Sequence, residues 1–394
     1  MKKDLNLIND FLQQQQQTHL YRRPRLSESA QQPSMLIDGQ QLLTFCSNDY
    51  LGLANHPKLI KAFESAAKQY GVGSGAAHLI NGHNIEHQLL EEEIAEFTGR
   101  ERALLFSTGY MANLGTISAL SEKNETIFQD RLNHASLIDA GRLSDATMWR
   151  YAHNDIENLE KRLNRHRDSA SMVITDGVFS MDGDEAKLNE MAVLAEQNKS
   201  WLMVDDAHGF GVLGKTGAGL VEQQKLTSDE VPVLMATLGK AAGTAGAFVA
   251  GNQDLIEYLI QSARTYVFTT AMPPAIAAAG RMSLRLIQEE SWRREQLQQN
   301  IKQFKQGAET LGLAMMPSET AIQPILMGSS AAALKASQQL QEKGILVTAI
   351  RPPTVPKNEA RLRVTLSASH TSLQIEQLLD ALAAVFVNQP IERA

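Results

Sequence analysis

The chain has 394 residues, 43% of them hydrophobic, which is enough for a large interior and for more than one domain. Lys and Arg number 37 against 44 Asp and Glu, and the resulting net charge of −7 excludes the basic footprint of a nucleic-acid-binding protein. The one cysteine, Cys46, excludes an intramolecular disulfide and suits a reducing compartment. The N-terminus lacks the apolar core of a secretory signal, and no apolar run is long enough to span a bilayer. We therefore expect a soluble, cytoplasmic protein.

Residues 1–45 are predicted to form an N-terminal arm with one helix. Leu5, Ile8 and Leu12 recur at helical spacing, which indicates a short amphipathic helix. The glutamines at 13–17 then fit the solvated end of that helix. A basic cluster follows at Arg22, Arg23 and Arg25.

Residues 46–285 are predicted to form a large α/β domain. Short runs rich in Val, Ile and Phe alternate with segments long enough for helices. Runs that are apolar at nearly every position fit strands buried on both faces, so we expect a mostly parallel sheet with helices on both faces. The predicted strands are 103–108, 126–129, 148–152, 172–176, 201–206, 233–237 and 246–251.

Residues 286–394 are predicted to form a smaller α+β domain. A polar, helix-like stretch leads to strands at 321–328, 344–350 and 361–368. An amphipathic helix from about Ser372 is expected to complete this domain.

Polar and ionisable residues gather just past the predicted strands of the large domain. Ligands of open parallel sheets bind beyond the carboxyl ends of the strands, so these residues are candidates for a binding site. The candidates are Gly109 and Tyr110 after the first strand, His134 after the second, Ser180 and Asp182 after the fourth, Asp205 and His208 after the fifth, and Thr237 and Lys240 after the sixth.

A cofactor with a phosphate, a pyridine ring and an aldehyde could use each of these groups. Backbone N–H groups at Gly109 would favour an anion, because a helix is expected to begin there. Asp205 could pair with a pyridinium nitrogen, His134 could stack on the ring, His208 could contact the ring oxygen, and Lys240 could form a Schiff base. Each residue alone is more often a cap or a solvated loop residue, so the argument rests on their combination.

A rival motif lies in the same region. GFGVLGKT at 209–216 matches the phosphate-binding loop of nucleotide hydrolases, with Lys215 and Thr216 in the key positions. Gly217 and Gly219 weaken the helix that should follow, and the strand at 233–237 supplies no Asp for magnesium. A nucleotide hydrolase therefore stays a remote alternative, as does a non-catalytic binding protein.

The strongest strings resemble the α-oxoamine synthase family of fold-type I pyridoxal 5′-phosphate (PLP) enzymes, over nearly the whole chain. They include SNDYLGLANHP (47–57), LFSTGYMAN (105–113), DRLNHASLIDA (130–140), TDGVFSMDGD (175–184), VDDAHGFGVLG (204–214), ATLGKA (236–241) and FTTAMPPA (268–275). The resemblance implies a PLP-dependent acyltransferase and a homodimer with active sites at the subunit interface. It implies no metal.

The resemblance also implies roles for individual residues. Lys240 would bind PLP covalently and later transfer a proton, Asp205 would contact the pyridine nitrogen, and His208 the ring hydroxyl. His134 would stack on the ring with Ser180 beside it, and Gly109, Tyr110 and Thr237 would hold the phosphate with Thr270 of the partner subunit. Position 176 is Asp where the family pattern leads us to expect Glu.

VTAIRPPTVP (347–356) and ARLRVTLSASH (360–370) resemble the biotin-pathway branch of the family. That branch condenses L-alanine with a pimeloyl thioester, carried on coenzyme A or on an acyl carrier protein, and loses CO2. Asn48 and Arg363 would position the amino acid, while Arg22 and Arg351 would complete the substrate contacts, with Tyr21 and Arg23 as other candidates for the distal carboxylate. A member of the family that uses glycine or serine with a different acyl donor is the main alternative.

Overall fold

The computed structural model describes residues 5–386, so the first four residues of the predicted arm and the last eight of the predicted small domain lie outside it. The described residues fall into two compact units. The first contains residues 5–48, 181–183 and 296–386, and the second contains residues 49–180 and 184–295. The predicted arm therefore belongs to the same unit as the C-terminal segment. No helix within residues 5–386 is long and apolar enough to cross a membrane.

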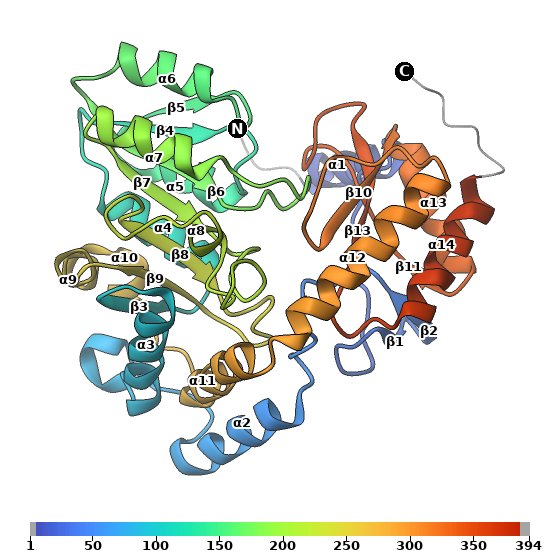
Figure 1. The fold of residues 1–394 in the computed structure, drawn as a ribbon, viewed down its shortest axis with the longest axis horizontal. Coiled ribbons are helices and arrows are strands. Elements are labelled where there is room, and N and C mark those ends of the chain that lie inside the picture. The colour runs from blue at the N-terminus through green and yellow to red at the C-terminus, as the bar shows by residue number, and fades with distance from the viewer. Residues whose placement is uncertain (1–4, 387–394) are drawn as a thin grey trace. The chain divides into compact units, whose positions relative to one another are not determined.

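The second unit is built on one sheet with the strand order β3-β9-β8-β7-β6-β4-β5 (Figure 1). Neighbours from β8 to β5 pair in parallel, whereas β9 runs antiparallel to both β3 and β8. This confirms the predicted mostly parallel sheet. The strands are β3 (Arg102–Phe106), β4 (Thr126–Asp130), β5 (Thr147–Tyr151), β6 (Ala170–Asp176), β7 (Trp201–Asp205), β8 (Val233–Thr237) and β9 (Ala247–Gly251).

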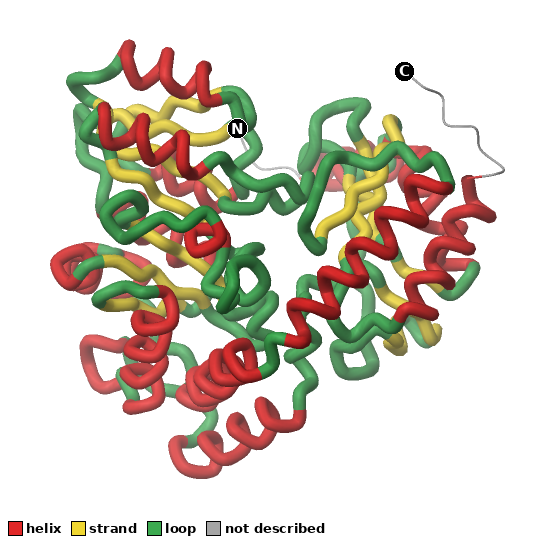
Figure 2. Tube along the Cα trace, in the orientation of Figure 1, coloured by secondary structure: helices red, strands yellow, loops and turns green. Residues whose placement is uncertain are grey.

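Both faces of this sheet are covered, as the continuous apolar runs predicted. Alternate residues such as Ile127, Ile174 and Met203 join one hydrophobic cluster with side chains of α4, α5 and α9, while Val173 and Val204 are also fully buried outside that cluster. Helices flank the strands in Figure 2. They are α2 (Pro57–Tyr70), η1 (His78–Gly82), α3 (Ile85–Thr98), α4 (Gly109–Ala119), α5 (Ala135–Leu143), α6 (Ile156–Arg165), α7 (Leu188–Gln197), α8 (Leu220–Gln223), α9 (Gln253–Ser262), α10 (Arg264–Val267) and α11 (Pro274–Glu289).

The first unit combines small sheets with helices. The strands β1, β2 and β11 form one sheet, and β10, β13 and β12 form another. Its elements are α1 (Leu5–Gln17), β1 (Ser34–Ile37), β2 (Gln40–Thr44), α12 (Trp292–Thr310), β10 (Ile322–Gly328), α13 (Ser330–Glu342), β11 (Ile345–Leu346), β12 (Thr348–Ile350), β13 (Ala360–Thr365) and α14 (Ser372–Phe386).

Two features of this unit differ from the sequence prediction. The predicted strand at 344–350 is split at Val347, so that β11 pairs with β2 and β12 pairs with β13. The hairpin of β1 and β2 was not predicted, because each strand is short and only alternate residues are buried. The predicted N-terminal helix is present, but its residues Leu5, Ile8 and Phe11 are all more than half exposed.

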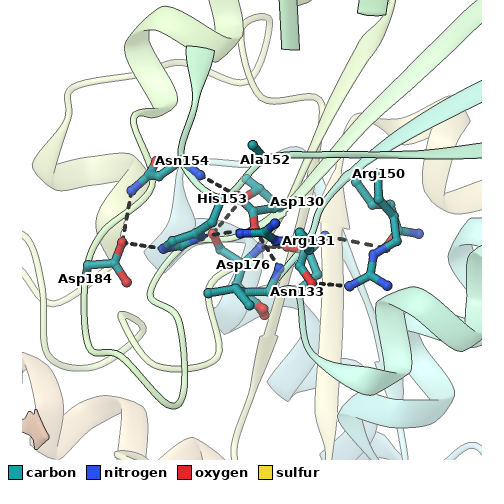
Figure 3. Close-up of polar contacts among 12 residues, drawn as sticks. Asp130, Arg131, Asn133, Arg150, Ala152, His153, Asn154, Asp176 and Asp184 are labelled. Atoms are coloured by element: carbon teal, nitrogen blue, oxygen red, sulfur yellow. Dashed lines mark hydrogen bonds and ion pairs between the residues drawn. The ribbon is translucent and has the colours of Figure 1, made fainter. Parts of the chain in front are cut away.

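His153 links the end of one strand of the second unit's sheet to the loop after another by hydrogen bonds (Figure 3). His153, just after β5, lies between Asp130 at the end of β4 and Asp184 in the loop after β6. Its Nδ1 is 3.1 Å from Asp130 Oδ1 and its Nε2 is 3.0 Å from Asp184 Oδ2. Asn154 reinforces the link by donating its backbone N–H to Asp130 Oδ2 and its side-chain amide to Asp184 Oδ2. Burial alone would lower the pKa of His153, but the two carboxylates outweigh it and raise the pKa to about 10.

This raised pKa predicts a pH-dependent contribution to stability. The protonated His153 stabilises the fold fully below its ordinary pKa of 6.5, and this contribution declines as pH rises toward about 10. The loss of thermal midpoint caused by His153→Gln should therefore be largest near pH 6 and shrink steadily up to pH 10. Thermal unfolding of both proteins at several pH values measures this difference.

His166→Gln is the control, since the His166 ring lies against Phe128 and Trp149 rather than between two carboxylates. If His153→Gln lowers the thermal midpoint by the same amount over the whole pH range, a protonated His153 between Asp130 and Asp184 is contradicted.

Candidate functional site

The site residues of the large domain come together at one edge of the second unit's sheet. Strands β4, β6, β7 and β8 are parallel, so their carboxyl ends share this edge. His134 follows β4, Asp205 ends β7, and Lys240 follows β8. The prediction that strand-end residues share one edge is therefore confirmed for these three.

A hydrogen-bonded chain contains Lys240. Lys240 Nζ lies 2.7 Å from His208 Nε2, and His208 Nδ1 lies 2.6 Å from the hydroxyl of Tyr50. An ammonium group only donates, so a charged Lys240 makes Nε2 an acceptor and leaves the ring proton on Nδ1, which then donates to Tyr50. Tyr50 is buried and therefore fixes the imidazole in this orientation.

A second chain contains Asp205. Its Oδ1 accepts from the backbone N–H of Ala207 at 3.0 Å, and its Oδ2 accepts from Asn113 Nδ2 at 2.7 Å. Asn113 also donates to Ser136 Oγ at 2.8 Å, and that hydroxyl lies 2.8 Å from His134 Nδ1. Asp205 and His134 are thus linked through two side chains, from α4 and α5, that hold both in place.

Asp176 holds the backbone of His134 in place. Its Oδ2 accepts the backbone N–H of His134 at 2.6 Å, and its own backbone N–H donates to Asn133 Oδ1 at 3.0 Å. Burial raises the pKa of Asp176 well above its usual range, and the charge of Asp205 adds to the shift. Burial also lowers the pKa of His134, so a neutral imidazole faces the site. Position 176 was expected to be Glu, and the shorter Asp176 found there binds the backbone N–H of His134.

The start of α4 offers an anion site. Thr108 caps the helix by accepting from the N–H of Met111 at 3.1 Å. The N–H groups of Gly109 and Tyr110 have no intrahelical acceptors, because they lie in the first turn of the helix. A Cβ placed on Gly109 would lie 4.0 Å from the Cβ of Thr237, so the end of β8 adjoins this helix start. The predicted phosphate residues Gly109, Tyr110 and Thr237 are therefore neighbours.

Two further predicted residues lie on loops of this unit. Ser180 follows β6 in a loop that is pinned by the bond from the Phe179 N–H to Asp184 O at 3.0 Å. Thr270 lies beside Ala77 in an isolated antiparallel bridge. The role of Thr270 in a partner's site stays a prediction.

The predicted substrate residues belong to the first unit. Arg363 on β13 donates from both terminal nitrogens to Asn48 Oδ1, each at 3.3 Å. Arg22 donates to Thr354 Oγ1 at 3.4 Å, and Arg351 donates to the backbone oxygen of His19. Partial burial lowers the pKa of Arg351, and the positive charge of Arg22 lowers it further. The two guanidinium groups therefore repel each other electrostatically.

The loop at 209–216 does not have the structure of a nucleotide-binding loop. The backbone N–H groups of Thr216 and Ala218, and the Thr216 hydroxyl, all donate to the carboxylate of Glu222 at 3.0–3.2 Å. Only the four-residue α8 follows. A phosphate would have to displace this carboxylate, so the structure gives the hydrolase alternative no support.

Sequence reasoning missed three residues of the site, namely Tyr50, Asn113 and Ser136. Tyr50 follows no strand of this sheet, and Asn113 and Ser136 lie inside α4 and α5 rather than directly after a strand, so the rule of strand ends did not select them. All three stand inside strings that carry the family resemblance, SNDYLGLANHP, LFSTGYMAN and DRLNHASLIDA, and that was the available signal.

The family model for class I and II aminotransferases matches residues 40–382. A protein of Pseudomonas fluorescens named 8-amino-7-oxononanoate synthase is 59% identical over 93% of this chain and 94% of its own length.

Solved structures agree with this match. A variant of serine palmitoyltransferase from S. paucimobilis, with PLP–myriocin bound, superposes with a TM-score of 0.92 at 30% identity and covers 98% of this chain and 99% of its own. An 8-amino-7-oxononanoate synthase from Francisella tularensis has a TM-score of 0.78 at 34% identity, over 88% of this chain and 98% of its own. The resemblance to α-oxoamine synthases is thereby confirmed, and the chain belongs to the class I and II aminotransferase family.

Proposed function

We propose that the chain is a PLP-dependent acyltransferase that condenses L-alanine with a pimeloyl thioester, releasing CO2 and the free thiol carrier and giving 8-amino-7-oxononanoate for biotin biosynthesis. The observation that carries the proposal is the placement of Lys240, His208, Asp205 and His134 at one sheet edge, in a chain 59% identical to a synthase of that name. The thiol carrier is coenzyme A or an acyl carrier protein.

The residues at the sheet edge fit PLP. Lys240 supplies an amine for the aldehyde, Asp205 a carboxylate for the pyridine nitrogen, and the start of α4 at Gly109 a place for the phosphate. His134 supplies a flat imidazole, held by Ser136, for the face of the ring. When bound, PLP supplies a pyridinium ring that stabilises negative charge at the Cα of an amino acid.

Each residue then has a defined task in proton transfer. Lys240 Nζ takes the Cα proton of L-alanine and later returns a proton to the product. Asp205 holds a proton on the pyridine nitrogen through its carboxylate, because a nearby negative charge favours the cationic ring. Once Lys240 holds PLP, its amine no longer donates to His208, and the Tyr50 hydroxyl can donate to His208 Nδ1. The ring proton of His208 is then on Nε2, which donates toward the ring oxygen, and Tyr50 acts as a positioning residue.

The first unit supplies the groups that suit the substrates' carboxylates. Arg363 donates from both terminal nitrogens to Asn48 Oδ1, and the planar guanidinium group has the forked geometry that binds a carboxylate in two places. Arg22 and Arg351 repel each other, and the distal carboxylate of a pimeloyl chain would relieve that repulsion. In this proposal Arg363 and Asn48 meet the amino acid, and Arg22 and Arg351 meet the acyl chain.

The enzyme is a homodimer in this proposal. Val72, Ile80 and Phe268 are 87%, 78% and 72% exposed. The segments that carry Ile80 and Phe268 are joined by the bridge of Ala77 to Thr270. Large apolar side chains gathered in this way mark a protein interface, and Thr270 would enter the partner's site from the same segment. A cytoplasmic location is also part of the proposal, and it suits the one cysteine of the chain.

The function predicts that Lys240→Ala loses both activity and covalent cofactor. Purified wild-type protein with PLP should release thiol from pimeloyl-CoA when L-alanine is added, and the variant should not, because it lacks the amine that holds PLP and moves the proton. A thiol-release assay and the visible absorption of lysine-bound PLP measure the two losses.

Lys215→Ala is the matched control, because Lys215 also follows a glycine but is exposed in the 209–216 loop. Turnover by Lys240→Ala would contradict the role of Lys240. Thiol release with glycine or L-serine but not with L-alanine would keep the family and contradict the biotin-pathway branch.

Asp205→Asn should slow exchange of the Cα proton of L-alanine by roughly 100-fold or more, the loss typical of a charge-stabilising group in an active site. Deuterium incorporation into L-alanine measures this step without the acyl donor. Asp206→Asn is the control, because Asp206 Oδ2 accepts the Leu220 N–H at 2.6 Å and an asparagine oxygen can accept the same bond. Equal exchange rates in wild type and Asp205→Asn would remove Asp205 from the mechanism.

Ile80→Asp should convert the dimer to monomer and reduce activity in parallel, since each site would lose the partner's Thr270. Sedimentation velocity over a range of protein concentrations measures the mass. Val193→Asp, which changes an exposed residue of α7, should leave a dimer. A wild-type protein that sediments as an active monomer would contradict the dimer without touching the assigned chemistry.

A further inference from the structure

Three histidines cluster at the turn between η1 and α3, outside the site described above. One ring nitrogen from each of His78, His83 and His87 lies within 4.8 Å of the other two. The ring centroids are 5.2 Å apart for His78 and His83, 5.1 Å for His78 and His87, and 5.7 Å for His83 and His87. The shortest approach is 2.9 Å, between the Nδ1 atoms of His78 and His83.

The protein holds these rings in place before any ligand arrives. His87 is fully buried, and its Nε2 lies 2.8 Å from the backbone oxygen of Met272, to which it donates. Its Nδ1 accepts the N–H of Asn84 at 2.9 Å, which assigns the ring proton to Nε2. The ring of His78 stacks on Tyr266 at 4.9 Å. A metal-bound histidine commonly has this arrangement, with its second nitrogen donating to a backbone oxygen.

The state of the rings also suits a metal. The hydrogen bonds of His87 leave its Nδ1 without a proton, which is the form in which an imidazole nitrogen binds a metal ion. His83 is partly exposed, with 29% of its side chain open to solvent, and this gives an ion a route to the cluster.

We propose that His78, His83 and His87 form a three-imidazole site for a divalent late first-row transition-metal ion such as Zn²⁺. Such ions prefer imidazole nitrogens at about 2.0–2.1 Å, which places two tetrahedral ligands about 3.3 Å apart. The 2.9 Å between the Nδ1 atoms of His78 and His83 needs only a small opening, and the ring that donates this bond changes tautomer. His87 binds through Nδ1 in place of the Asn84 N–H and keeps its bond to Met272.

The site is structural rather than hydrolytic. Residues 83–87 match the H-x-x-E-H pattern of some zinc hydrolases, in which the glutamate serves as the base. Here Glu86 Oε2 is instead paired with Arg281 at 2.8 Å, and His83 lies outside α3, which Asn84 caps. The ion would therefore fasten the η1 turn to the start of α3 and, through His87, to the segment at Met272. This inference does not depend on the proposed function.

The test uses full-length protein loaded with PLP, so that Lys240 is occupied, and stripped of metal with a chelator. Zn²⁺ is then titrated in competition with a chromogenic chelator. One equivalent should bind per chain and raise the thermal midpoint, because an ion that binds only the folded state stabilises it. His83→Gln should weaken binding by more than the roughly 10–100-fold that loss of an outer-shell partner costs.

His19→Asn is the matched control, since His19 is exposed on the arm and Asn tolerates its positive φ of 60°. It should bind Zn²⁺ as the wild type does. A wild type that takes up no Zn²⁺, or a His83→Gln protein that binds as tightly as wild type, overturns the proposal. Co²⁺ provides a second measurement on the wild type alone: the intense visible bands of a tetrahedral complex are expected, and their absence at saturation also overturns it.

Discussion

The cost of burying carboxyl groups governs the site. Asp130, Asp176, Asp205 and Asp206 are all almost fully buried at one edge of the sheet, and isolated charges there would be strongly destabilising. The structure meets this constraint differently for each. Asp130 is paired with His153, Asp176 accepts from the His134 backbone, and Asp206 accepts from the Leu220 N–H at 2.6 Å.

The cost of burying charge also disfavours the ionised forms of two of these acids. Burial raises the pKa of both Asp176 and Asp206 well above the usual range, and the charge of Asp205 raises each further. Asp176 and Asp206, whose protonated forms are favoured by this shift, flank Asp205, whose carboxylate accepts from Asn113 and the Ala207 N–H. In the proposed function, the Asp205 carboxylate would meet the positive charge of a pyridinium ring, and protonated neighbours would not compete with it for that charge.

Sequence reasoning found the parts of the fold whose signal is local. Buried strands such as β6 and β8 are marked by continuous apolar runs, and the side chains just past them had to share one edge. Tyr50, Asn113 and Ser136 carry no such mark, because each acts through a partner that the fold brings from 158, 92 and 23 residues away, respectively. The split between β11 and β12 was equally hidden, since the choice of sheet depends on β2 and β13 rather than on the strand itself.

Two glycine–lysine pairs illustrate why environment, and not a motif alone, determines chemistry. Lys215 sits in a string that matches a phosphate-binding loop, yet the N–H groups of Thr216 and Ala218 beside it already bind the carboxylate of Glu222. Lys240 sits in a less distinctive string, but its amine touches an imidazole that a buried tyrosine orients. A phosphate loop needs free backbone donors, whereas a cofactor lysine needs a held partner for its proton. Lys240 has such a partner in His208, whereas the Thr216 N–H beside Lys215 is already bound to Glu222.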